Sequence, residues 1–293
     1  MTRSYLSIMA AAVLWGCIGI FLKLLTAAGL DSMQAVSVRV ILAALLYSAF
    51  LLVTDRKKFS IRLRDVWYFV GTGILSLVFF NWCYFNAIKA IGEGGLGIAA
   101  VLLYTAPVFV MIMSAVFFRE KLTPVRMIAL ALTFGGCLLV TGVVGRAVKL
   151  PARAILFGLG SGFGYALYSI FGKVAMKRYS SQTVTVYSFI FASAAVIPFT
   201  LGGDWSGMLT ARGIFGALGI SVLCCILPYI LYTAGLERVE PGRASVMATV
   251  EPVVAAIVGI AYGEIPGGLQ IAGMVLVIGA ICIMNLAEKQ KKK

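Results

Sequence analysis

The chain has 293 residues, of which 61% are hydrophobic and only 12% are charged, and its formal net charge is +14. Ordinary soluble domains are about 45–50% apolar, so this composition excludes a soluble globular fold and indicates a membrane protein. The apolar residues gather in stretches of about 17 to 25, the length with which a helix crosses a bilayer.

Ten such stretches follow one another along the chain, and each is predicted to be a transmembrane helix. They cover residues 5–27, 35–53, 66–88, 96–118, 125–144, 154–174, 183–199, 213–236, 244–262 and 269–286. The segments between them are too short to form a soluble domain, so any binding or chemistry is expected inside the membrane. The sequence therefore predicts an all-α polytopic membrane protein with ten transmembrane helices.

Lysine and arginine are divided unevenly between the two sets of loops that this topology creates. These residues are retained on the cytoplasmic side of membranes. With the N-terminus inside, the inner segments hold 17 of them: Arg3, Arg56, Lys57, Lys58, Arg62, Arg64, Arg119, Lys121, Arg126, Lys177, Arg178, Arg238, Arg243, Lys289, Lys291, Lys292 and Lys293. The outer loops hold five: Lys89, Arg146, Lys149, Arg153 and Arg212. Both termini of this multi-pass protein are therefore predicted to face the cytoplasm, with the plasma membrane as its location.

The same topology accounts for the positive charge without a nucleic-acid partner, because the basic residues are spread over several short loops and the tail. The first stretch resembles a signal peptide in having Arg3 ahead of an apolar run, but its length and Lys23 favour an uncleaved span. The chain has no histidine, and its six cysteines lie in apolar stretches without a C-x-x-C pair. No metal site, cofactor or enzymatic centre is expected from these residues.

The two halves of the chain carry an internal repeat. LWGCIGIFLK at 14–23 aligns with GYALYSIFGK at 164–173, QAVSV at 34–38 with QTVTV at 182–186, and APVFVMIMSAVFFRE at 106–120 with EPVVAAIVGIAYGE at 251–264. Two five-helix repeats are therefore predicted, over residues 1–145 and 152–288. An odd number of spans per repeat inverts the second repeat in the membrane. Inverted repeats are typical of secondary transporters, whose substrate site lies near the midplane where the repeats meet.

Three segments resemble the EamA family of the drug/metabolite transporter superfamily. They are the early Leu-Trp-Gly run that ends in Lys23, the segment LLYTAPVFVMIMSAVFFREKLTP, and its counterpart VEPVVAAIVGIAYGE ahead of a glycine-rich last span. The resemblance covers both halves and implies a ten-helix carrier, with amino acids, nucleosides and other small metabolites among the family's substrates. Between residues 88 and 107 the first half is three residues longer than its counterpart at 236–252, so this outer connection is expected to be locally unusual.

Polar and small residues at helical spacing mark the predicted substrate pathway. One stripe on the sixth span comprises Ser161, Tyr165, Tyr168, Ser169 and Lys173, and one on the first span comprises Ala11, Trp15, Gly19 and Lys23. Residues three and four apart share a helix face, and lipid offers polar groups no partners, so these faces are expected to turn towards protein or a cavity. The alternative is that both lysines snorkel to the interface and the aromatic residues form a belt there.

Weaker pathway candidates lie on the third and eighth spans. They are Asn81, Tyr84, Tyr229, Tyr232 and Thr233, for which hydrogen bonding between helices is an equal alternative to substrate contact. On the sixth span, Gly158, Gly160, Gly162 and Gly164 are predicted to allow close helix packing. Bending of that helix during transport is the alternative role of these glycines.

Glu251 is the only ionisable side chain between Arg243 and Glu264. Its distance from Arg243 along a helix is about 12 Å, which places it near the middle of a hydrocarbon core about 30 Å thick. An ionisable residue at that depth is a functional candidate. Glu251 is therefore predicted to couple transport to protons or to bind a substrate amine, and the alternative is a structural role that includes pairing with Arg39.

Prolines mark two predicted helix discontinuities. Pro252 follows Glu251 directly, and Pro107 lies at the equivalent place in the other half, behind Tyr104 and Thr105. Proline removes a backbone donor and disturbs the helix. Carriers use such broken helices at the midplane to expose backbone groups to the substrate.

The sequence therefore predicts a secondary transporter that moves small polar or amphipathic metabolites such as amino acids by alternating access, with export favoured over import. The alternative function is a flippase for a lipid-linked precursor, which fits the same superfamily and the basic inner loops. The predicted partners are a small-molecule substrate and membrane lipids, with proton coupling as a further hypothesis.

Overall fold

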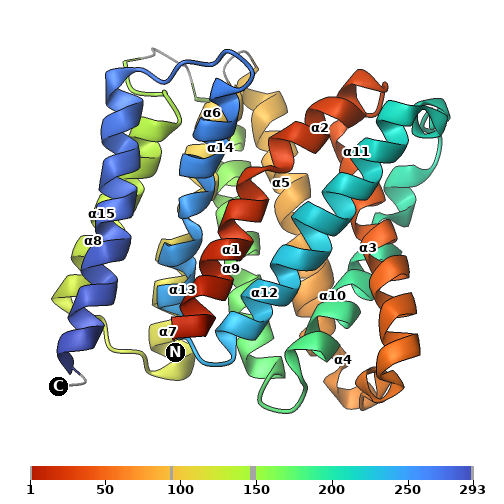
Figure 1. Ribbon diagram of the computed structural model, residues 1–293, viewed down its shortest axis with the longest axis horizontal. Helices are drawn as coiled ribbons and strands as arrows, with labels where there is room; N and C mark the ends of the chain where they lie inside the picture. Colours follow the sequence, from red (N-terminus) through yellow and green to blue (C-terminus); the bar gives the residue numbers. More distant parts are fainter. Residues whose placement is uncertain (1, 93–94, 146–149, 292–293) are drawn as a thin grey trace.

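The structure, a computed structural model, describes residues 2–92, 95–145 and 150–291, and every regular element in these ranges is helical (Figure 1). Eight apolar helical segments are long enough to cross a membrane, and two shorter apolar helices, Pro124–Val140 and Gly268–Met284, complete a set of ten. The predicted all-α, ten-helix membrane fold is thereby confirmed. Four residues that contributed to the predicted orientation, Arg146, Lys149, Lys292 and Lys293, lie outside the described residues.

The first half contains the elements α1 to α8. They are α1 (Thr2–Gly16) with α2 (Ile18–Ala27); α3 (Ser32–Thr54); the short η1 (Arg56–Phe59) and η2 (Leu63–Asp65); α4 (Val66–Phe69), the π-helical η3 (Val70–Val78) and α5 (Phe79–Ile91); α6 (Gly95–Leu103) with α7 (Ala106–Phe118); and α8 (Pro124–Val140). Side chains define several ends. The Asp31 carboxylate and the Gln34 side chain form a capping box at the start of α3, and Thr123 caps α8 ahead of Pro124.

The second half contains the elements α9 to α15. They are α9 (Ala152–Ala175); α10 (Ser181–Val196) with η4 (Ile197–Thr200); η5 (Ser206–Leu209); α11 (Ala211–Ser221), the π-helical η6 (Val222–Ile226) and α12 (Leu227–Leu236); α13 (Pro241–Ala248) with α14 (Val250–Ile260); and α15 (Gly268–Lys291). The hydroxyls of Ser180 and Thr210 accept hydrogen bonds from the first turns of α10 and α11. These caps satisfy backbone donors at the helix ends.

The two halves share irregular features at equivalent places. The third span of each half contains a π-helical piece, η3 or η6. The fourth span of each half is interrupted, between Leu103 and Ala106 in the first half and at Thr249 in the second. Each break lies just before the proline that was expected to mark it. Pro107 and Pro252 occupy the first turn of the helix after the break, where a missing N–H leaves no intrahelical bond unmade.

Helices of one half pack directly against helices of the other. Helix α8 lies along α15, α5 along α9, and α1 along α12, while η3 contacts α10 (Figure 1). In this arrangement the two halves are interleaved across the molecule. Any cavity near the centre is therefore bordered by both repeats.

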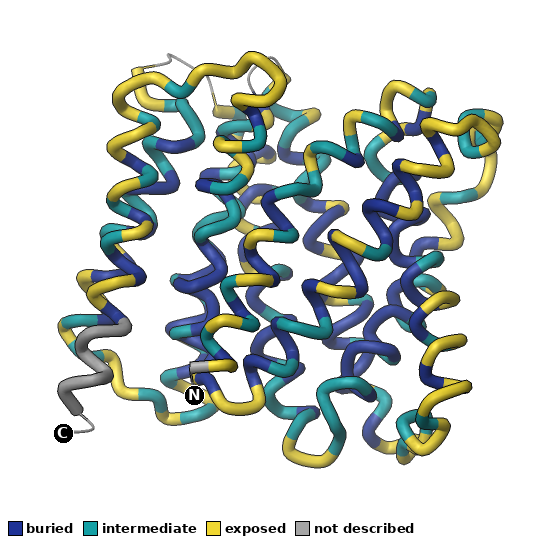
Figure 2. The backbone as a smooth tube through the Cα atoms, viewed as in Figure 1, coloured by how far each residue is buried: buried dark blue, intermediate teal, exposed yellow. Residues whose placement is uncertain are grey.

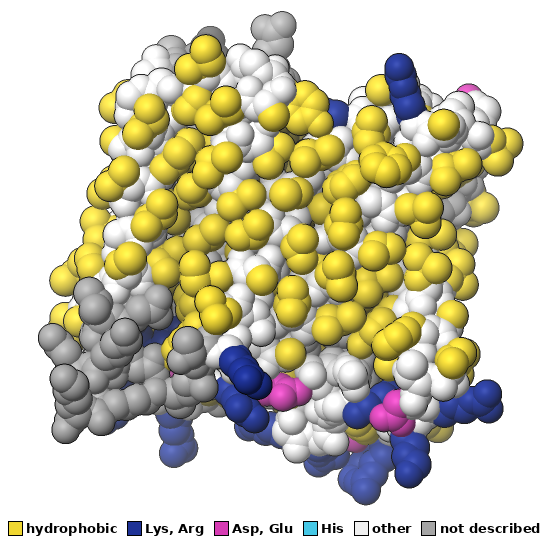
Figure 3. Space-filling view, in the orientation of Figure 1, with side chains coloured by type: hydrophobic (Ala, Val, Ile, Leu, Met, Phe, Trp, Pro, Cys, Tyr) yellow, Lys and Arg dark blue, Asp and Glu magenta, His cyan; other side chains and the backbone are white. Residues whose placement is uncertain are grey.

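The N-terminus and the end of α15 lie at the same end of the helical bundle (Figure 1). Lysine and arginine side chains gather at this end, and hydrophobic side chains cover most of the rest of the visible face (Figure 3). We call this the basic end and the other the opposite end. Span α1–α2 starts at the basic end, whereas Lys173 near the end of α9 reaches the loop at residues 236–239 there. The first spans of the two halves therefore run in opposite directions.

Exposed residues follow the outer surfaces of the helices, and buried residues line their inner surfaces (Figure 2). The exposed set includes large apolar side chains in the middle of spans, such as Leu45 and Ile278. An apolar outer surface suits contact with lipid, which solvates hydrocarbon and offers polar groups no partners. The largest buried cluster joins α1, α3, α10 and α12 around Trp15, Tyr47 and Phe189.

Candidate functional site

A cavity of about 460 Å³ lies between the two halves of the molecule. Helices α1, α2, α3, α5 and α6 of the first half and α9, α12 and α14 of the second contribute to its wall. Residues at or next to the three helix interruptions line this space: Gly16 and Ile18 beside Cys17, Tyr104 in the break before α7, and Glu251 after Thr249. Its volume lies within the range of about 300–1,000 Å³ that is typical of small-molecule sites.

The cavity reaches the opposite end of the molecule. Ser32 at the start of α3, Thr141 after α8, and Gln270 in the first turn of α15 contribute to its outer wall. Among the described residues, none from the loops of the basic end lines it. The cavity therefore opens towards the opposite end and is closed towards the basic end.

Aromatic side chains from four helices, α1, α5, α9 and α12, form one wall of the cavity. The ring centroid of Trp15 lies 6.3 Å from that of Tyr165 and 5.3 Å from that of Tyr229, both edge-to-face. Phe80 meets Tyr165 edge-to-face at 5.6 Å. These rings come from both repeats, so relative movement of the repeats changes the shape of this wall.

Glu251 lies in the first turn of α14 and lines the cavity, beside Pro252. The first turn of α14 packs closely against α1 because Gly16 has no side chain. A Cβ placed there would come within 2.9 Å of the Glu251 carbonyl oxygen and 2.6 Å of Val254 Cβ. Arg39 lines the same cavity, but the ion pair with Glu251 that the sequence left open is not formed.

A layer of paired hydroxyl groups lies next to the aromatic wall, on the side of the cavity that faces the basic end. Tyr168 Oη lies 2.8 Å from Thr233 Oγ1, and Ser169 Oγ lies 2.8 Å from Tyr232 Oη. All four side chains are buried. Trp15 packs on Tyr232 with a centroid distance of 5.3 Å, so α1 of the first half covers this layer of the second.

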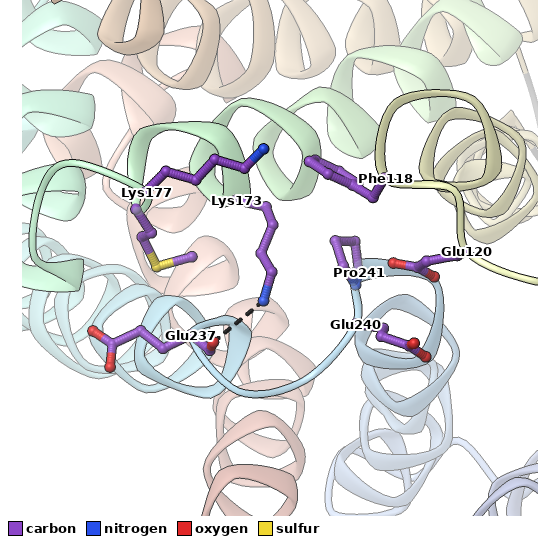
Figure 4. A pocket seen from close by; sticks show the side chains of 8 residues that line it. Phe118, Glu120, Lys173, Lys177, Glu237, Glu240 and Pro241 are labelled. Atoms are coloured by element: carbon purple, nitrogen blue, oxygen red, sulfur yellow. Dashed lines mark hydrogen bonds between the residues drawn. The ribbon is translucent and has the colours of Figure 1, made fainter.

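Lys173 lies one further turn towards the basic end. Its Nζ donates to the backbone oxygens of Leu236, Glu237 and Val239, the last two at 3.3 and 3.2 Å. The side chain lines a second cavity, of about 450 Å³, together with Glu120 and others (Figure 4). Lys173 thereby ties the end of α9 to the loop between α12 and α13.

A cluster of four charged residues joins the two halves at the basic end. Arg126 Nη1 lies 3.5 Å from the Glu120 carboxylate, and Arg126 Nη2 contacts Glu240. Glu240 also accepts from Arg243 Nε at 3.0 Å. Burial raises the pKa of the Glu120 carboxyl to about 7, and the negative charge of Glu240 adds to this effect while Arg126 opposes it.

Lys23 lies at the rim of the first cavity. Its Nζ is 3.1 Å from Glu264 Oε1 and 4.1 Å from the ring centroid of Tyr262. Both charged side chains are more than half exposed, so the pair is solvated and is worth little energetically. Glu264 itself lines the cavity, whereas Lys23 does not.

The structure separates the predicted pathway residues into two groups. The cavity is lined by Trp15, Gly19, Asn81, Tyr84, Tyr104, Tyr165, Tyr229, Glu251 and Pro252. Its lining does not include the others, which are Ala11, Lys23, Thr105, Pro107, Ser161, Tyr168, Ser169, Lys173, Tyr232 and Thr233. Thr105 instead hydrogen-bonds the Leu102 carbonyl and contacts α9 at Gly162.

Two features of the site were missed from the sequence. Arg39, which lines the cavity, was considered only as a structural partner of Glu251. Its position inside a predicted span was the available signal, because an intramembrane charge marks a functional candidate. The charge cluster around Glu120 and Arg126 was counted only as loop charge, although Glu120 and Glu264 end the two aligned repeat segments.

Comparison with known proteins identifies relatives over the whole length of the chain. The EamA-like transporter family matches residues 2–142 and again residues 152–286. An uncharacterized transporter of Archaeoglobus fulgidus is 30% identical over 288 residues, covering 94% of each chain. The threonine/homoserine exporter RhtA of Salmonella typhimurium is 30% identical over 213 residues, covering 70% of this chain and 67% of that protein.

A protein of known crystal structure superimposes with a TM-score of 0.84 over the full length of both chains at 14% sequence identity, which shows a shared fold. The two family matches coincide with the two five-span halves that the sequence repeat outlines. The chain therefore belongs to the EamA-like transporter family.

Proposed function

We propose that this transporter is a secondary carrier that exports small polar or amphipathic metabolites, with amino acids as the favoured class, across the plasma membrane. The observation that carries the proposal is the central cavity, which lies between two inverted repeats and opens at one end only. Inverted repeats allow the two ends to open in turn. The relative named as a threonine/homoserine exporter supports both export and the amino-acid class.

The contacts below the cavity act as a gate in this proposal. The hydroxyl layer of Tyr168 and Ser169, the bonds of Lys173, and the cluster around Arg126 together hold the basic end closed. Their partners lie on α12, on the loop that follows it and at the start of α13. Release of these contacts opens a route from the cavity to the basic end.

The excess of lysine and arginine supports a cytoplasmic location for the basic end. The cavity then faces outward in this structure, and a solute that is exported leaves from this state. The opposite state, which loads solute from the cytoplasm, requires the gate to open.

Glu251 is the proposed coupling residue. Its carboxylate lines the cavity in the middle of the span, beside the interruption at Thr249. An acid there meets water from whichever end is open, so it can take up a proton on one side and release it on the other. Intramembrane carboxylates serve this role in proton-coupled carriers.

The first testable prediction concerns Glu251→Gln, which removes the titratable proton while keeping the side-chain shape. In proteoliposomes with an imposed proton gradient, the variant should lose the acceleration of transport by the gradient and the pH dependence of the rate. Solute exchange without a gradient is the control, because it does not require proton coupling. Wild-type rates and an unchanged pH profile in the variant would exclude Glu251 as the coupling residue.

A flippase for a lipid-linked precursor is the alternative function, and two further assays separate it from the carrier. Export of a water-soluble metabolite from intact overexpressing cells, found by untargeted metabolomics, supports the carrier. Translocation of a labelled lipid across the same proteoliposomes, without movement of soluble metabolites, would support the flippase instead.

A further inference from the structure

Arg39 lies in α3 with 5% of its surface exposed, and it lines the cavity. Two of its guanidinium nitrogens, Nε and Nη2, have no hydrogen-bond partner among the described residues. A guanidinium remains charged at any physiological pH, and a buried charge without a partner is costly. Such a group in a cavity wall therefore favours binding of an anion, since no described residue is hydrogen-bonded to these two nitrogens.

The cavity lining contains two other charged side chains, Glu251 and Glu264. Glu264 is engaged by Lys23 at 3.1 Å. Glu251 is near enough to Arg39 to interact with it electrostatically, yet no ion pair joins them. The central cavity is thus lined by one cation, Arg39, and one anion, Glu251, that form no ion pair with each other.

We propose that Arg39 and Glu251 bind the two charges of an α-amino acid, the guanidinium taking the carboxylate and Glu251 taking the ammonium. This inference rests on the proposed transport function and specifies its substrate class. Nε and Nη2 form one edge of the guanidinium, and that edge binds a carboxylate through two parallel hydrogen bonds. The unpartnered atoms of Arg39 are therefore the ones that a bidentate carboxylate uses.

A zwitterion fits this arrangement better than an amine or an acid. A simple amine leaves Arg39 without an anion, and a simple carboxylate leaves Glu251 without a cation, so each leaves one buried charge unpaired. The rings of Trp15 and Tyr229 offer a second contact to the ammonium through their π faces. Small residues such as Ala256 leave room in the lining for an amino-acid side chain.

The test begins with isothermal titration calorimetry, which measures the binding of each of the twenty L-amino acids to the full-length protein in detergent. L-Threonine is then compared with 1-amino-2-propanol, which lacks its carboxylate, and with 3-hydroxybutyrate, which lacks its amine. If another amino acid binds more tightly, its own decarboxylated and deaminated analogues replace these. Wild-type protein should bind the amino acid at least about tenfold more tightly than either analogue, since each lost charge contact is worth about that factor.

Two variants assign the charges separately. Arg39→Gln should weaken amino-acid binding about tenfold or more and leave binding of the amine unchanged. Glu251→Gln should weaken amino-acid binding similarly and leave binding of the acid unchanged. Arg39→Lys keeps the charge and should retain part of the affinity for the amino acid. Arg212 is exposed at the opposite end, so Arg212→Gln should leave the affinities for the amino acid, the amine and the acid unchanged.

The melting temperature separates a binding role of Arg39 from a structural one. Because Arg39 leaves two donors unpartnered, Arg39→Gln should melt at or above the wild-type temperature, whereas loss of a structural contact would lower it. Equal weakening of the amine and the amino acid by Arg39→Gln would overturn the proposal. So would the absence of binding by every amino acid while another metabolite is exported, a result that leaves the proposed metabolite carrier standing but removes amino acids as its favoured class.

Discussion

Residues of the same type have different partners in this molecule, and these partners define their roles. Lys23 and Lys173 occupy equivalent repeat positions, yet Lys23 pairs with exposed Glu264 while Lys173 donates to backbone oxygens of the segment between α12 and α13. Similarly, Tyr165 lines the cavity, whereas Tyr168, one turn along α9, is buried in the hydroxyl layer below it.

The two tyrosines give a prediction that separates substrate contact from gating. Tyr165→Leu should lower the transport rate about tenfold, the effect of losing one aromatic contact of about 1.4 kcal/mol, and leave the melting temperature near that of the wild type. Tyr168→Leu should instead lower the melting temperature, because the hydroxyl of Thr233 loses its partner inside the protein. Transport per folded molecule and thermal unfolding in detergent measure the two effects. Identical behaviour of the two variants would contradict the distinction.

Glu120 gives a prediction with a defined pH dependence. Its pKa is raised from an ordinary value of 4.5 to about 7, so between these values the folded protein holds a proton that the unfolded chain has released. Stability from this group is therefore lost as the pH rises from about 4.5 to about 7. Relative to the wild type, Glu120→Gln should gain about 2–3 kcal/mol in the free energy of unfolding between pH 5 and pH 8, since about two pH units separate pH 5 from the raised pKa. Melting curves in detergent at several pH values measure this, and a pH-independent difference would contradict it.

At the scale of elements, irregular helical segments recur at equivalent places in the two halves. A π-helical turn leaves the regular hydrogen-bond ladder and is frequent at functional sites. The segments η3 and η6 occupy the third span of each half, and the interruptions at Tyr104–Thr105 and Thr249 occupy the fourth. These four irregular segments are related by the repeat, so they change position together when the halves move.

The close packing of α9 against α6 can be tested directly by mutation. A Cβ at Gly162 would lie 2.5 Å from Thr105 Oγ1 and 3.0 Å from the Leu102 carbonyl oxygen, next to the break before α7. Gly162→Ala should therefore destabilise the protein by about 1–3 kcal/mol through overpacking and lower transport. Gly172→Ala on the same helix meets nothing within 4 Å and should be neutral or slightly stabilising. If the Gly162→Ala and Gly172→Ala variants have the same melting temperature, Gly162 does not have this packing role.

The sequence predicted the helices well and the irregular segments incompletely. Apolar length and the aligned repeats were sufficient for the ten spans, because a bilayer imposes that length on every crossing. The prolines located the fourth-span breaks to within a few residues, since proline in the first turn follows a break as readily as it causes one. The π-helical segments and the break at Cys17 have no comparable signal. They depend on packing between distant helices, as does the approach of Arg39 to the cavity.

At the scale of the whole molecule, the repeat suggests how the closed end opens. Lys173 and Glu120 are the repeat equivalents of Lys23 and Glu264. In this structure the pair at the open end is formed, while Lys173 and Glu120 line the second cavity and Lys173 donates to backbone oxygens. If the halves exchange conformations, Lys173 and Glu120 approach each other in the state that opens to the basic end.

Thiol labelling tests alternating access of the central cavity most directly. Ala256 lines the cavity on α14, and Ala256→Cys is introduced after the native cysteines are replaced. A membrane-impermeant reagent should reach this cysteine from the opposite-end side at rest, and from the basic-end side only while solute is being transported. A cross-link between cysteines at Glu120 and Lys173 should restrict labelling to the basic-end side. Labelling from one side only, under every condition that supports transport, would contradict alternating access.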